Sequence, residues 1–140
     1  MNFNNFTIKS QEAVQQAIQL VQNRGQQAIE AEHLLAGVLK VGENVTNFLF
    51  QKLGMNGAQI ANVLDKQIAS LPKVTGGEPY LSRTSNEVLQ KSVELSKGLG
   101  DEYVSLEAML LALLSVKSTA STILKDAGMN EKDLRTAINE

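Results

Sequence analysis

The stretch Glu32-His33-Leu34-Leu35-Ala36-Gly37-Val38-Leu39 has a counterpart in Glu107-Ala108-Met109-Leu110-Leu111-Ala112-Leu113-Leu114, 75 residues further along the chain. Both stretches begin with a glutamate and continue as an almost wholly apolar run. An acid in the first turn complements the positive N-terminus of a helix, and a helix that is apolar all round is usually buried. The two stretches therefore predict two equivalent buried helices in a chain built from two copies of one unit.

The match between the two copies extends in both directions. At the same offset the identical pairs are Ser10 and Ser85, Glu12 and Glu87, Gln15 and Gln90, Leu20 and Leu95, Gly25 and Gly100, Val41 and Val116, and Leu49 and Leu124. One residue is then lost, and Gly54-Met55-Asn56 falls on Gly128-Met129-Asn130. We therefore predict one domain over 1–140, with a first repeat at about 6–71, a linker at 72–82 and a second repeat at about 83–140. Prolines and glycines in the linker disfavour a helix and predict a loop.

Each copy is expected to form four helices. Apolar residues spaced i, i+3, i+4 and i+7 predict a first helix around 13–21 and around 88–96, and shorter stripes predict a third helix around 45–49 and around 120–124. No run alternates between polar and apolar residues for long enough to predict a strand. The expected fold class is all-α, with eight helices arranged as two pseudo-symmetric four-helix repeats.

The helix ends carry their own signals. Thr84-Ser85-Asn86-Glu87 is expected to form a capping box at the first helix of the second copy. Gly54 and Gly128 are expected to end the third helices in the left-handed conformation. Asn56 and Asn130 are expected to cap the fourth helices.

The composition excludes several classes of function. The chain is 43% hydrophobic and 20% charged, which excludes a disordered protein, and its net charge of −2 with scattered basic residues argues against binding of nucleic acid. It has no cysteine, and its single histidine, His33, has no partner at a metal-ligand spacing, so we expect no metal site and a structural role for His33 at its helix start. No phosphate-binding or hydrolase motif is present, and no apolar run approaches the ~20 residues of a membrane span. We therefore expect a cytoplasmic module that is not an enzyme by itself and holds no cofactor.

The doubled pattern resembles a known family. Phe6-Thr7, then Glu32-His33-Leu34-Leu35, then Leu53-Gly54, repeated after about 75 residues, is similar to the N-terminal domain of the Clp AAA+ unfoldases. The linker Leu71-Pro72-Lys73-Val74-Thr75-Gly76-Gly77 and the segment from Gly100 to Glu107 are most similar to the ClpB disaggregase branch of that family.

The resemblance implies a binding module attached to a motor. It implies that this domain engages exposed hydrophobic segments of unfolded or aggregated polypeptides, is a monomer in isolation, and belongs to a longer homohexameric protein that works with a co-chaperone. ATP and Mg²⁺ would belong to ATPase domains absent from this chain. The alternative is the N-terminal domain of a protease-linked Clp ATPase, which docks adaptor proteins.

Six residues are candidates for the substrate site. The resemblance implies that Thr7, Asp101 and Glu107 take part in substrate handling, although Asp101 could be only a turn residue and Glu107 only a first-turn acid. From the apolar pattern we expect Leu89, Leu95 and Met109 to line a solvent-reachable groove, with the two acids on its rim. The alternative is that the helix containing Met109 is buried on all sides.

One further position bears on this groove. Ala108 occupies the place that His33 holds in the first copy. A small residue there is expected to make the groove shallower than in relatives of the family.

Overall fold

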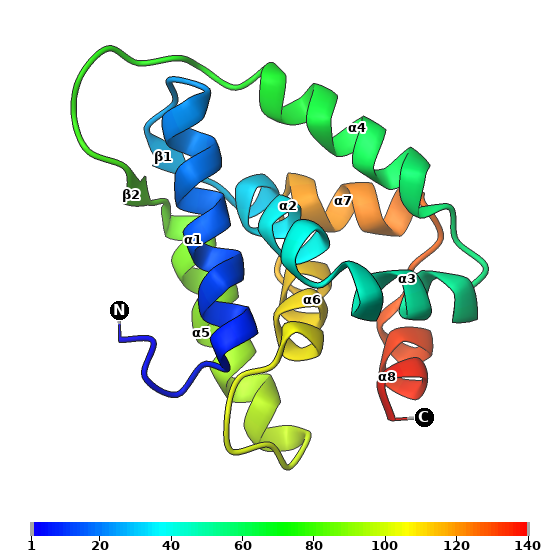
Figure 1. The fold of residues 1–140 in the computed structure, drawn as a ribbon. Helices are drawn as coiled ribbons and strands as arrows, with labels where there is room; N and C mark the ends of the chain where they lie inside the picture. Colours follow the sequence, from blue (N-terminus) through cyan, green and yellow to red (C-terminus); the bar gives the residue numbers. More distant parts are fainter. Residues whose placement is uncertain (1, 140) are drawn as a thin grey trace.

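The computed structural model describes residues 2–139, and within them the chain forms eight helices and two very short strands (Figure 1). The first repeat contains α1 (Ile8–Asn23), β1 (Ala28–Ile29), α2 (Ala31–Val41), α3 (Glu43–Lys52) and α4 (Gly57–Ala69). The second contains β2 (Tyr80–Leu81), α5 (Arg83–Gly98), α6 (Leu106–Ser115), α7 (Thr119–Asp126) and α8 (Glu131–Asn139). The predicted all-α class is confirmed. Met1 and Glu140, the ends of the predicted domain, lie outside the described residues.

The helix boundaries repeat with the sequence. Helices α1 and α5 both have 16 residues, and each begins directly after a hydroxyl residue, Thr7 or Ser82, whose side chain accepts a hydrogen bond from the backbone N–H three residues on. The capping box predicted at Thr84 is wrong. Ser82 is the N-cap, because a bond from its own N–H to the carbonyl of Ile29 holds it in an extended conformation just outside the helix.

The turn signals behave as predicted. Gly54 and Gly128 have φ angles of 67° and 107°, in the left-handed region that glycine adopts without a steric penalty. The side chains of Asn56 and Asn130 accept hydrogen bonds from the backbone N–H groups of Gln59 and Asp133, at 3.1 and 2.9 Å. The last helix of each copy therefore begins in the same way.

The two buried helices form the centre of the domain. Helix α2 contacts α6, and the outer helices cross between the halves: α1 also contacts α6, α5 also contacts α2, α4 contacts α7, and α8 contacts α3 (Figure 1). All side chains from Ala108 to Leu114 are at most 1% exposed. The two copies therefore share one hydrophobic core.

Within residues 2–139 no single helix is long and apolar enough to cross a membrane. Helices α6 and α7 reach the required length and apolarity only when taken together, and the pair is bent by 95°.

Two strand pairings, which the sequence did not predict, join the halves reciprocally. In the parallel pair β1–β2, Ile29 lies opposite Leu81, and in a second parallel bridge Val104 lies opposite Phe6. Leu81 is the repeat equivalent of Phe6, and Val104 is the equivalent of Ile29. The last residues of the predicted linker are therefore not loop: Tyr80 and Leu81 belong structurally to the second repeat. Elements of one or two residues give no period-two pattern to detect.

Helices α1 and α2 approach each other closely at Gly37 of α2, where an added Cβ would clash with the carbonyl oxygen of Ala13 in α1. Gly37→Ala is expected to destabilise the domain by about 1–3 kcal/mol, because the overpacking outweighs the better helix propensity of alanine. Urea unfolding followed by circular dichroism measures the change.

The repeat supplies the control for this variant. Ala112 holds the equivalent place in α6, where α5 leaves room for a methyl group. Ala112→Gly is expected to cost about 2 kcal/mol, through the lower helix propensity of glycine and the loss of one buried methyl group. A Gly37→Ala variant as stable as the native chain would contradict the close approach.

Candidate functional site

Thr7, Asp101 and Glu107 come together in the structure. They line one pocket of about 440 Å³, here called the acidic pocket. Thr7 lies before α1, Asp101 in the loop between α5 and α6, and Glu107 in the first turn of α6. The bridge between Phe6 and Val104 brings these segments together, with Thr7 N–H donating to the carbonyl of Val104 at 3.0 Å. The complete lining is Thr7, Leu99, Asp101, Glu102, Tyr103, Ser105, Glu107, Ile138 and Asn139.

The three predicted polar residues have different freedom to bind. The Thr7 hydroxyl is occupied by capping α1, since it accepts from the backbone of Ser10 and donates to the Ser10 hydroxyl at 2.9 Å. Asp101 is exposed and Glu107 is half-buried, and neither carboxylate has a hydrogen-bond or ion-pair partner within residues 2–139. The two carboxylates are therefore the groups available to a ligand, whereas Thr7 caps α1 and thereby positions one side of the acidic pocket.

The predicted apolar groove is wrong. Leu89 and Met109 are fully buried, and Leu95 is 8% exposed, so these side chains form core rather than a surface that solvent reaches. Helix α6 is covered by α2, α5, α7 and α8, which leaves Met109 no open flank. Ala108 is also fully buried. The alternative that α6 is buried on all sides is the one the structure supports.

Other apolar residues, which the sequence pattern did not single out, are exposed around the acidic pocket. Ile8 directly follows Thr7 and is 74% exposed, and Tyr103 lines the pocket and is 50% exposed. Phe48 of α3, also 50% exposed, lines an adjoining hollow of about 340 Å³ that shares Glu107 and Ile138 with the acidic pocket. One available signal was a mismatch between the copies: the equivalents of Ile8 and Tyr103 are Arg83 and Ala28.

The larger cavity of the first repeat is less suited to this role. It encloses about 630 Å³ between α1, α2, α3 and α4. It contains none of the six predicted residues, and none of the exposed large apolar side chains lines it. The acidic pocket with its adjoining hollow is therefore the better candidate site.

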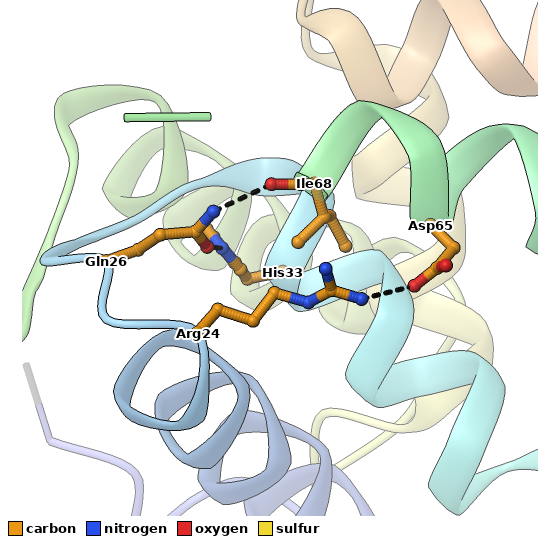
Figure 2. A network of polar contacts seen from close by, with 5 residues as sticks. All are labelled: Arg24, Gln26, His33, Asp65 and Ile68. Carbon is orange, nitrogen blue, oxygen red and sulfur yellow. Dashed lines mark hydrogen bonds and ion pairs between the residues drawn. The ribbon is translucent and has the colours of Figure 1, made fainter. Parts of the chain in front are cut away.

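In the first repeat, the positions equivalent to the acidic pocket carry a closed polar network (Figure 2). His33 Nδ1 accepts a hydrogen bond from the Glu30 N–H at 2.9 Å, so the proton of the neutral ring lies on Nε2, which donates to Gln26 Oε1 at 2.8 Å. Gln26 Nε2 donates to the carbonyl of Ile68 at 2.7 Å. Burial and the charge of Arg24 lower the pKa of His33 to about 4. The structural role expected for His33 at its helix start is confirmed.

Glu32, the equivalent of Glu107, belongs to the same buried region. Its side chain is 5% exposed, and burial, together with the nearby Glu30 charge, raises its pKa. Hydrogen bonds from the backbone and from Gln67 oppose that rise. The same acid of the repeat motif is thus buried in one copy and half-buried, in the lining of the acidic pocket, in the other.

Comparison with known proteins assigns the family. The model of the family described as Clp repeat (R) N-terminal domain matches residues 5–127, which span the first repeat and the second repeat through α7. The chain belongs to the Clp N-terminal domain family. The resemblance inferred from the repeated motifs is thereby confirmed.

The relatives of this Clp N-terminal domain include full-length chaperones. The protein named Chaperone protein ClpB of Bacteroides thetaiotaomicron is 78% identical over all 140 residues, and the chain spans 16% of its length. This similarity favours ClpB over the protease-linked alternative.

Solved structures show the same fold. The Hsp104 N-terminal domain from Candida albicans has a TM-score of 0.84 at 22% identity, covering 98% of this chain and 91% of that one. A ClpV N-domain in complex with a VipB peptide has a TM-score of 0.73 at 22% identity, covering 97% of this chain and 86% of that one.

Proposed function

We propose that this Clp N-terminal domain is the substrate-engaging module of a ClpB-type, ATP-dependent protein disaggregase. It binds exposed hydrophobic segments of unfolded or aggregated polypeptides at the acidic pocket and the adjoining hollow. The observation that carries the proposal is that exposed Tyr103 and Phe48 line the acidic pocket and the adjoining hollow beside two unpartnered carboxylates, with exposed Ile8 next in sequence to Thr7 of the pocket lining. Exposed apolar groups that cluster on a protein surface mark interaction sites.

The chemistry of the site fits weak and permissive binding. Burying one such apolar side chain supplies about 1.5–3 kcal/mol, whereas association costs at least about 4 kcal/mol, so several contacts must form together. Asp101, Glu102 and Glu107 line the acidic pocket, and no Lys or Arg of the described chain does. The site therefore favours segments in which Lys or Arg flank the apolar residues.

The relatives support the wider setting of this proposal. ClpB chaperones are about six times as long as this chain, which spans 16% of the Bacteroides protein. In our proposal ATP and Mg²⁺ act in other domains of a homohexamer that works with a co-chaperone, and the isolated N-terminal domain is a monomer without enzymatic activity. The absence of cysteine is consistent with a reducing, cytoplasmic setting. The solved ClpV N-domain, which has this fold, was bound to a peptide.

The double variant Ile8→Ser with Tyr103→Ser tests the site. It is expected to weaken binding of an unfolded protein at least tenfold, since each lost apolar contact removes more than the 1.4 kcal/mol that a factor of ten represents. The probe is reduced, carboxymethylated α-lactalbumin, titrated into the isotope-labelled domain and followed by amide NMR shifts.

The control removes an exposed apolar residue elsewhere. Val63 on α4 is 46% exposed and lines neither the acidic pocket nor the adjoining hollow. Val63→Ser is expected to leave the affinity unchanged. Equal binding by the double variant and the native domain would rule out this site.

A further inference from the structure

We propose that the two repeats carry one pocket in two states, sealed in the first repeat and open in the second. Four residues form the seal: Arg24, Gln26, His33 and Asp65. The domain therefore offers one binding pocket of this kind and not two, a statement that rests on the proposed function of the acidic pocket.

The burial of equivalent residues differs between the copies. Gln26 is 7% exposed, whereas its equivalent Asp101 is exposed. Glu32 is 5% exposed, whereas its equivalent Glu107 is half-buried and lines the acidic pocket. The strand pairings and helix starts around both sites are equivalent. In the first repeat, residues 71–80 also contact the loop after α1, where the Val74 N–H donates to the carbonyl of Gly25, and α4 continues to Ala69, whereas α8 is described to Asn139, the equivalent of Asp65. The side chains that differ between the copies account for the remaining part of the difference.

The seal ties the loop after α1 to the last turns of α4. Gln26 donates a hydrogen bond to the carbonyl of Ile68 and accepts one from the Nε2–H of His33, so it joins α4 to the start of α2. Arg24 pairs with Asp65 at 2.5 Å, again from that loop to α4 (Figure 2). The loop and α4 are thus held against each other by side-chain contacts on both sides of Gly25.

Each member of the seal is replaced in the second repeat. Leu99 stands for Arg24, Asp101 for Gln26, Ala108 for His33 and Asn139 for Asp65. Leucine cannot pair with asparagine, and alanine has no ring to reach Asp101. Three of the four replacements, Leu99, Asp101 and Asn139, line the acidic pocket, which lies between the loop after α5 and α8. The pocket is open where the contacts of the seal are missing.

Transplanting the central pair tests the inference. The variant D101Q/A108H introduces the Gln26–His33 pair into the second repeat, and D101Q alone controls for the lost charge. The reverse variant, Q26D/H33A, removes the pair from the first repeat. All are titrated with reduced, carboxymethylated α-lactalbumin under amide NMR, and amide hydrogen exchange is measured without the probe.

The expected results are specific to each repeat. In the native domain the probe shifts amides around 99–107 and not those around 24–32. D101Q/A108H should bind at least tenfold more weakly than D101Q, with its added histidine titrating well below pH 6 and the amides of 99–105 exchanging at least tenfold more slowly. Q26D/H33A should show a second set of probe-dependent shifts around 24–32 and faster exchange there.

Failure of the inference can be told apart from failure of the proposed function. Two results would overturn the seal. One is a probe-induced shift of amides in both repeats of the native domain. The other is equal affinity of D101Q/A108H and D101Q for the probe when the added histidine has the lowered pKa. If D101Q/A108H does not fold, Q26D/H33A decides, and unchanged exchange and shifts around 24–32 overturn the inference. If the probe shifts no amide around 99–107 in the native domain, the proposed function is wrong. The amide exchange rates of the variants then test the seal by themselves.

Discussion

Replacing Met109 with serine is expected to destabilise the domain by about 3–5 kcal/mol, a large part of the stability of an ordinary domain. The side chain is fully buried in α6, the central helix of the second repeat. The change leaves a cavity and places a hydroxyl among apolar groups, where an unsatisfied polar group costs a further 1–3 kcal/mol or so. Thermal and urea unfolding measure the loss.

Met55 provides the matched control. It is a methionine in a turn before α4 and is only partly buried, so Met55→Ser is expected to cost about 1 kcal/mol. If Met109→Ser instead left the stability unchanged and abolished binding of unfolded protein, Met109 would be a surface contact and its placement in the core would be wrong.

The stability of the domain is also expected to fall as the pH drops from 6.5 to about 4. His33 is neutral in the folded state, where its pKa is lowered to about 4 from the ordinary 6.5. In this range the unfolded chain takes up a proton that the folded chain does not, so protonation favours unfolding. The stabilisation is complete above pH 6.5 and is lost as the pH falls to about 4. The difference between these pKa values corresponds to roughly 3 kcal/mol.

His33→Asn isolates this effect from other titrating groups. Asparagine can still accept the Glu30 N–H bond but does not titrate. Glu32 acts in the opposite sense, because its raised pKa lets the folded state keep a proton that the unfolded state releases. That contribution is present in both proteins, so the difference between their urea midpoints at pH 4.5 and 7.5 reports His33. An imidazole that titrates near pH 6.5 in the folded domain would contradict the prediction.

The fold could be predicted from the sequence because each signal for a helix end occurs twice, at equivalent positions of the two repeats. Gly54 and Gly128, or Asn56 and Asn130, are each ambiguous alone, but as equivalent pairs they define the ends of equivalent helices. The apolar run of α6 also carried the correct signal, since a helix without a polar face is buried on every side. The predicted groove contradicted that signal, because it placed Met109 at a surface that solvent reaches. It also placed Leu95, a leucine of the apolar stripe of α5, in the wall of the groove.

The candidate site was only partly predictable. Thr7, Asp101 and Glu107 were named from the family resemblance, and their meeting depends on a single-residue bridge between Phe6 and Val104 that leaves no pattern in the sequence. Ile8, Tyr103 and Phe48 were missed because an isolated apolar residue on the surface looks the same in sequence as one in the core. A comparison of equivalent positions distinguishes two of them, because Arg83 is the equivalent of Ile8 and Ala28 is the equivalent of Tyr103.

The reciprocal strand pairs mean that neither repeat can complete its own structure. The segment that precedes the first helix of each repeat is paired with the other repeat, at Phe6–Val104 and at Ile29–Leu81. Two identical single repeats could satisfy both pairs as a twofold-symmetric dimer. Joining them through 72–79 makes that association intramolecular and independent of protein concentration. The domain therefore corresponds to a twofold dimer of repeats that are joined covalently and differ in sequence. Proteolytic cleavage within 72–79 should leave two fragments that remain bound to each other.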